Sequence, residues 1–109
     1  MTRVTGSYDW LSGECELEVL DHATGSERVC AAVSGLVCAL AGYLKNAEHS
    51  LAALVHECTV EPGCCRFRFS AGDEGCGAFL VTAIGLEQLA EEFPGYVQAE
   101  ITDNIAFRE

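Results

Sequence analysis

The sequence predicts a small α+β domain in which two helices pack on one antiparallel or mixed sheet, with elements in the order ββαββαβ. Three observations carry this prediction. Short stretches of alternating polar and apolar residues indicate strands, two long apolar stretches indicate helices, and two Pro-Gly pairs mark turns. The 109 residues suit one domain, so we expect residues 1–109 to form a single domain.

The first two predicted strands lie near the amino terminus. Residues 2–9 have a weak strand pattern. Glu14–Val19 alternates strictly, which predicts a half-buried strand with its glutamates facing water and Cys15 among the residues facing the core. The same alternation, continued past the strand, puts His22 on the outer side of the strand's end.

A long apolar stretch predicts the first helix, at about Ser26–Asn46. Thr24 and Glu27 fit a capping box at its start, and Ser26 is the competing N-cap. Either start leaves Cys30 near the amino end of the helix.

One face of this helix is apolar and built from small residues. Ala31, Gly35, Ala39 and Gly42 would let another backbone approach closely. A helix with almost no charged face in so small a chain indicates that a partner covers it, so we expect a homodimer. The longest apolar run, Val29–Leu44, has sixteen residues and is interrupted by Ser34 and two glycines. It is shorter than the ~20 residues of a membrane span, so no membrane segment is expected.

The carboxyl-terminal half predicts a hairpin, a helix and a last strand. The hairpin pairs His56–Glu61 with Cys64–Ser70. A glycine-rich connector follows at Ser70–Gly77, then a helix at Ala78–Phe93 and a strand at Tyr96–Thr102. Ion pairs are expected across the hairpin, between arginines and glutamates: Arg66 and Arg68 with Glu57 or Glu61.

Charge and cysteine content narrow the classes of function. Six basic against 17 acidic residues give a net charge of −11, which disfavours direct binding of nucleic acid or of an anionic membrane. Such a surface favours a basic partner. Seven cysteines, an odd number, indicate thiols in a reducing cytoplasm, and the first residues lack the apolar segment of a secretory signal.

Two residues have the spacing of a nucleophile and its base. Cys30 lies near the amino end of a helix, where the partial positive charge stabilises a thiolate. His22 lies eight residues earlier, at the end of the preceding strand, and a short loop can bring the two together. Backbone N–H groups at 25–28 would then hold the oxyanion. Composition alone favours the alternative, which is a buried and inert thiol.

A zinc site is a weaker interpretation. Thiolates and imidazole are suitable ligands, but the chain has no C-x-x-C pair. Two of the candidate cysteines are adjacent on one predicted strand, so their side chains point to opposite faces. The candidate set is His56, Cys58, Cys64, Cys65 and Cys76.

Two short stretches carry a family resemblance, DHATG at 21–25 and VCAAVS at 29–34. They resemble the Prp family, the ribosomal-processing cysteine proteases, whose members have a Gly-His-Ala segment, a glycine-containing loop and then Asp-Ile-Val-Cys-Ala-Ala-Val-Ser at the start of a helix. The resemblance is close over residues 14–46. It extends more loosely to the order of the elements and to EEFPGY at 91–96.

The resemblance implies a homodimeric, cytoplasmic endopeptidase with a Cys/His dyad, which removes the N-terminal extension of a large-subunit ribosomal protein. By matching position, Cys30 is the nucleophile and His22 the general base. Gly25, Glu27 and Ser34 are the expected substrate-binding residues, with Glu27 where the family has Asp. No metal or other cofactor is expected, and the partner is a basic peptide.

The sequence departs from the family pattern in two further ways. Asp21 replaces the glycine before His22, and that glycine permits a positive φ. The loop between His22 and Cys30 is a few residues shorter than in most members. An alternative function is therefore a non-catalytic binding or regulatory protein on the same fold.

Overall fold

The computed structural model describes residues 1–9, 11–21 and 26–104, and its elements follow the predicted order ββαββαβ. The strands and helices are β1 (Thr2–Asp9), β2 (Glu14–Leu20), α1 (Glu27–His49), β3 (Ala53–Glu61), β4 (Cys64–Ala71), α2 (Asp73–Glu92) and β5 (Val97–Asn104).

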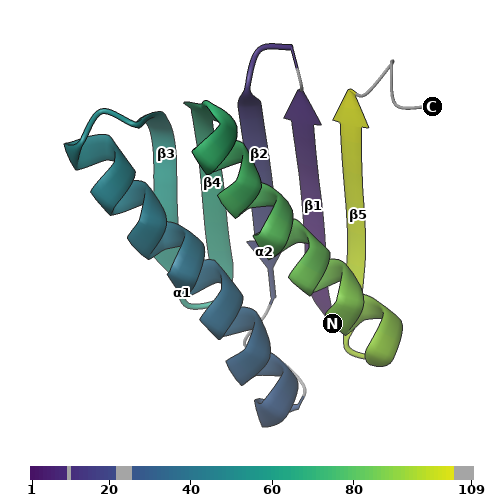
Figure 1. Cartoon of the computed structure of the whole chain (residues 1–109). Helices are drawn as coiled ribbons and strands as arrows, with labels where there is room; N and C mark the ends of the chain where they lie inside the picture. The colour runs from purple at the N-terminus through teal and green to yellow at the C-terminus, as the bar shows by residue number, and fades with distance from the viewer. Residues whose placement is uncertain (10, 22–25, 105–109) are drawn as a thin grey trace.

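The strands form one five-stranded sheet in the order β3-β4-β2-β1-β5. All neighbours are antiparallel except β1 and β5, which are parallel, so the sheet is mixed. Both helices cover the same face of the sheet, and the other face is open (Figure 1). This two-layer arrangement confirms the predicted α+β fold class.

The side chains of the sheet alternate between the two faces as predicted. On β2, Cys15, Leu17 and Val19 are buried beneath the helices, whereas the glutamates between them face the open side. Phe67 and Phe69 of β4 are buried in the same core. The alternation of a strand that is covered on one face is thus enough to assign its core residues.

Helix α1 starts slightly later than the capping box predicted. Ser26 is its N-cap, and the Ser26 Oγ accepts a hydrogen bond from the Val29 N–H at 3.4 Å. The assignment of Thr24 as the N-cap is therefore wrong, and the competing cap is confirmed; Thr24 itself lies outside the described residues. The helix continues to His49, past the predicted end at Asn46.

Helix α2 starts five residues before its predicted start. The stretch that was expected to be a connector forms its first turns, because Asp73 and Glu74 suit the positive end of a helix dipole. Gly75 is buried against β4, where a side chain would collide with the Cβ of Ala71. This glycine therefore permits close packing of helix on strand and does not indicate a loop.

The expected pairing of Arg66 with Glu57 or Glu61 is wrong. Arg66 Nε instead lies 2.7 Å from the Glu18 carboxylate on β2. Strand β4 is flanked by β3 and β2, and in register Arg66 faces Thr59 on β3 and Glu18 on β2. The sequence pattern of a hairpin shows only one of a strand's two neighbours.

By length and composition α1 could cross a membrane, since the whole helix is longer than the apolar run within it. Core helices meet the same criterion, and one such helix is weak support for a membrane location. Val33, Val37, Leu40 and Leu44 line one side of α1 and are buried in the core. This one-sided packing is typical of a helix that covers a sheet.

The end of α1 has the hydrogen bonds of a Schellman motif. The N–H groups of Leu51 and Ala52 donate to the carbonyls of Glu48 and Ala47, at 3.2 and 2.7 Å. Leu51 has a φ of 63° and is 89% exposed. This position is usually glycine, because a side chain makes the left-handed conformation costly.

We therefore expect Leu51→Gly to raise the free energy of unfolding by about 1 kcal/mol, since it relieves the strain and loses little packing. Urea denaturation measures the change. The matched control is Leu54→Gly, which removes an exposed leucine from β3 and should destabilise the protein. Equal destabilisation by both variants would contradict the strain at Leu51.

A hydrogen bond between the helices sets a high-pH limit on stability. The pKa of Tyr43 is raised to about 12, mainly by burial. The hydrogen bond that its hydroxyl donates to Glu74 Oε1, at 2.9 Å, is the second cause. Because the folded state favours the neutral phenol, this stabilisation is complete below about pH 10 and is lost as the pH rises through about 12.

Phenolate absorbance, compared between the native protein and Tyr43→Phe, should give this elevated pKa. Glu74→Gln should lower it part of the way toward 10, because burial remains the larger cause. A Tyr43 that titrates near 10 in the folded native protein would contradict the prediction.

Candidate active site

Cys30 lies in the first turn of α1, as predicted. Its backbone N–H donates to the Ser26 carbonyl at 2.9 Å, which fixes the first turn of the helix. The Cys30 side chain is half-buried. The thiol is therefore held at the positive end of a 23-residue helix, with part of its surface open to solvent.

Two of the other predicted site residues share this helix face. Glu27 is the first helical residue and is exposed, and Ser34 is half-buried one turn beyond Cys30. Spacings of three and four residues place Glu27, Cys30 and Ser34 on one side of a helix. His22 and Gly25, the other two predicted site residues, lie outside the described residues.

The backbone turns before it reaches His22. Strand β2 ends at Leu20, and Asp21 adopts the left-handed conformation with a φ of 59°. The predicted alternation past the strand end therefore stops at Leu20. Aspartate is one of the few residues other than glycine that adopt this conformation, so Asp21 keeps the backbone shape that the family glycine permits.

Asp21 is anchored from two directions. Its N–H donates to the Gly63 carbonyl in the β3–β4 turn at 2.8 Å, and its carboxylate lies 3.4 Å from Arg3 on β1. The end of β2, the β3–β4 turn, the start of β1 and the start of α1 all lie at one end of the molecule (Figure 1). The loop that carries His22 thus starts and finishes on fixed elements.

The seven cysteines lie within the described residues, and each is a thiol. Burial raises the pKa of the Cys15, Cys58 and Cys65 thiols, which suppresses their reactive thiolate form. Cys38 is exposed on α1, two turns beyond Cys30. Of the thiols with access to solvent, Cys30 is in the first turn of α1 and Cys38 in its middle, whereas Cys58 and Cys64 lie on β3 and β4.

The proposed zinc ligands are not brought together. The described residues hold no group of three or more His, Cys, Asp or Glu side chains placed to bind a metal ion. Cys65 is buried beneath the helices, and Cys64 precedes it on β4, so the two point to opposite faces.

A polar cluster on the open face was not predicted. His56 Nε2 lies 3.1 Å from Ser70 Oγ and 3.8 Å from the Glu14 carboxylate, and the Ser70 hydroxyl donates to Glu14. The three residues come from β3, β4 and β2. No sequence signal could have found this cluster, because it depends on the register of three strands and on an irregularity of β3 between Val55 and Glu57.

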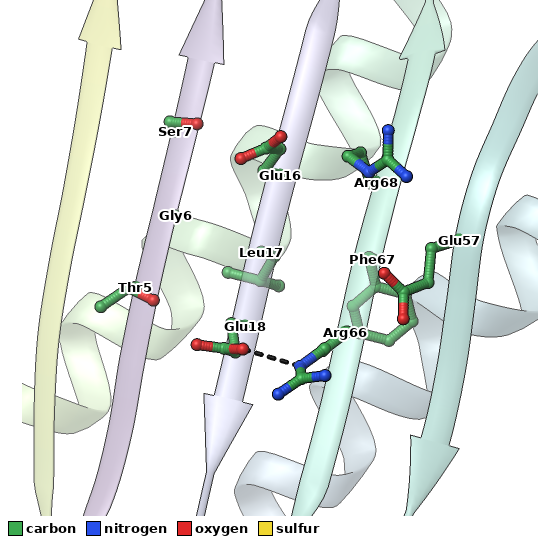
Figure 2. Close-up of a pocket in the computed structure, with 10 residues that line it drawn as sticks. All are labelled: Thr5, Gly6, Ser7, Glu16, Leu17, Glu18, Glu57, Arg66, Phe67 and Arg68. Carbon is green, nitrogen blue, oxygen red and sulfur yellow. Dashed lines mark hydrogen bonds and ion pairs between the residues drawn. The ribbon is translucent and has the colours of Figure 1, made fainter.

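A pocket on the open face lies across four strands (Figure 2). Its charged lining residues alternate in sign: Glu16 and Glu18 of β2, Arg66 and Arg68 of β4, and Glu57 of β3. The Arg66–Glu18 ion pair occupies part of it (Figure 2). The arginines weaken the electrostatic attraction that the glutamates alone would have for a basic ligand. The described residues that line the pocket include no cysteine, so the pocket lacks a thiol nucleophile.

Known proteins resemble the chain in structure. No family model matches it, and no curated protein matches it by sequence. The crystal structure of SMU.848 from Streptococcus mutans is 26% identical, with a TM-score of 0.68 over 95% of this chain and 96% of that one. The essential ribosomal processing protease Prp from S. aureus, with a covalently linked product peptide, is 18% identical with a TM-score of 0.72.

That match covers 93% of this chain and 99% of the S. aureus chain. The chain has the Prp fold. A second structure of the S. aureus Prp, with a substrate peptide, is 17% identical, with a TM-score of 0.60 over the same shares of the two chains. The resemblance seen in the sequence is thus confirmed for the fold, along nearly the whole length of both proteins.

Proposed function

We propose that this protein is a Prp-type cysteine endopeptidase that removes the N-terminal extension of a large-subunit ribosomal protein. The observation that carries the proposal is the position of Cys30, in the first turn of α1 on a Prp fold. Asp21 supports the proposal, because it replaces the family glycine and still adopts a left-handed conformation that glycine readily adopts.

In the proposed mechanism, His22 removes the proton from the Cys30 thiol. The sulfur attacks the scissile carbonyl carbon, and the N–H groups at the start of α1 stabilise the oxyanion. When the C–N bond breaks, His22 gives its proton to the leaving amine and a thioester remains on Cys30. Water, deprotonated by His22, then hydrolyses the thioester to a carboxylate and restores the thiol.

The proposed substrate is a basic peptide. Ribosomal proteins are strongly basic as a class, so the net charge of −11 would favour their encounter with this protein in the cytoplasm. Glu27 is exposed beside Cys30 and supplies a negative charge at the site itself. Ser34 would provide a hydroxyl one turn farther along the same face.

We also propose that the protein works as a homodimer. The side of α1 away from the sheet exposes four small, uncharged residues, Ala31, Gly35, Ala39 and Gly42. Val81 and Ile84 of α2 are 70% and 53% exposed. A second copy would cover these apolar residues, which are otherwise in contact with water.

The direct test uses the full chain and a synthetic peptide that spans the N-terminal extension and first residues of the ribosomal protein. Mass spectrometry of the products should show one cleavage site, with faster turnover at low than at high salt because the encounter is electrostatic. An intact peptide after prolonged incubation with the reduced protein would contradict the proposed activity. It would favour the non-catalytic alternative if the peptide still bound.

A further inference from the structure

Two buried thiols meet at the end of the molecule opposite the start of α1. Cys15 lies near the start of β2 and Cys76 in the first turn of α2, and each thiol acts on the other electrostatically. Each thiol donates its proton to a backbone carbonyl, Cys15 to Gly13 at 3.6 Å and Cys76 to Ala71 at 3.5 Å. Both acceptors belong to neighbouring turns, so the two sulfur atoms occupy one small site.

The backbone around the pair is closely packed. The Ala71 N–H donates to the Gly13 carbonyl at 3.1 Å, and a side chain at Gly13 would collide with the Ala71 carbonyl oxygen. Tyr8 is buried beside the site: it acts electrostatically on both cysteines, and its ring centroid lies 5.8 Å from that of Phe79. The two cysteines are therefore held near each other on elements that have little freedom to separate.

Access from solvent is narrow and falls on one of the two residues. Cys15 is fully buried, and Cys76 is 8% exposed. A small oxidant can therefore reach Cys76 more easily than Cys15. The start of β2 and the start of α2 are far along the sheet from the start of α1 (Figure 1), so the pair takes no part in the proposed peptidase mechanism.

We propose that Cys15 and Cys76 form an oxidisable dithiol, which closes to a disulfide under peroxide and fixes β2 to α2. The Cys76 sulfur attacks the peroxide, so an S–O bond forms, the O–O bond breaks and one water leaves. The Cys15 sulfur then displaces the oxygen from Cys76, the S–S bond forms, and the released hydroxide takes the Cys15 proton as a second water. The two thiols lose two electrons, and the peroxide gains them.

The disulfide would stabilise the fold. It would close a loop of about 60 residues, and the restriction of the unfolded chain increases slowly with the length of the closed loop. It would join the sheet to the helix layer, from the start of β2 to the first turn of α2. We therefore expect oxidation to raise the Tm by about 5 °C or more.

The experiment treats the reduced full-length protein with hydrogen peroxide, blocks the remaining thiols and maps the peptides by mass spectrometry. We expect a Cys15–Cys76 link, a mass lower by two hydrogens and a higher Tm. Cys76→Ser should lose both the link and the rise in Tm, whereas the matched control Cys38→Ser, at an exposed cysteine, should keep both.

Peptide mapping of the native protein decides the question even if Cys76→Ser fails to fold. The proposal is overturned if Cys15 and Cys76 are recovered as blocked thiols after the exposed cysteines have been oxidised. It is equally overturned if the two are linked and the Tm does not rise. Neither result bears on peptide cleavage, so this inference and the proposed function can fail separately.

Discussion

Cys30→Ala is expected to lower the rate of peptide cleavage by at least about 1,000-fold, because the variant has no nucleophile to form the thioester. His22→Ala should have a similarly large effect, since the thiol then loses its base and the amine its acid. The two losses should not add, because both residues serve the same step. Initial rates on the synthetic peptide measure all three variants, including the double variant.

Cys38→Ala is the matched control. It removes a thiol from the same helix, and Cys38 is the more exposed of the two residues. Its cleavage rate should stay within about twofold of the native rate, because Cys38 lies outside the catalytic site and alanine adds no bulk to the small-residue face of α1. Equal losses in Cys30→Ala and Cys38→Ala, or native activity in Cys30→Ala, would contradict the assignment of Cys30. Circular dichroism of each variant separates lost chemistry from lost folding.

Gly35→Arg is expected to convert the proposed dimer to a monomer, with a dimer affinity at least about 100-fold weaker. Gly35 lies on the exposed face of α1, and a Cβ there meets nothing within 4 Å in one chain. The single chain therefore tolerates a side chain at this position. A second copy packed on the small residues of the face would not, because an arginine would hold the two backbones apart and bury its charge.

Gel filtration and sedimentation over a range of concentrations measure this change. Gln98→Arg, on the exposed β5, adds the same charge away from the helices and should remain a dimer. Gly35→Ala should stay folded and gain helix stability of about 1 kcal/mol in the monomer. A native protein that is monomeric at low micromolar concentration, or a Gly35→Arg that dimerises like the native protein, would contradict the proposed interface.

The sequence predicted the features that depend on short-range patterns. Strict alternation identified β2 and β4 and assigned their buried residues, because the period of a covered strand is local information. It missed the start of α2, since Gly75 lies there to fit against Ala71 and looks like a loop residue without that contact. The Arg66–Glu18 pair was missed for a related reason, since it joins strands that are distant in the chain.

In the candidate site, too, the sequence predicted what depends on nearby residues and missed what depends on contacts between distant parts of the chain. The position of Cys30 followed from the capping residues before it, and the structure confirms it in the first turn of α1. The conformation of Asp21 could be anticipated only from the family glycine, because its partners, the β3–β4 turn and Arg3 of β1, are distant in the chain. The Cys15–Cys76 pair required the packing of α2 on the sheet, which no spacing in the sequence encodes.

The most direct test of the central claim compares the seven thiols of the native protein in their reaction with iodoacetamide at pH 6. Peptide mapping over time gives a rate for each cysteine. Exposure in the single chain would make Cys38 the fastest, although the proposed dimer would cover its helix face and slow it. A thiolate stabilised by the helix start and by His22 should make Cys30 faster than Cys38 by at least about tenfold. A Cys30 that reacts no faster than Cys38 would contradict a catalytic Cys30 and favour a binding or regulatory protein on the Prp fold.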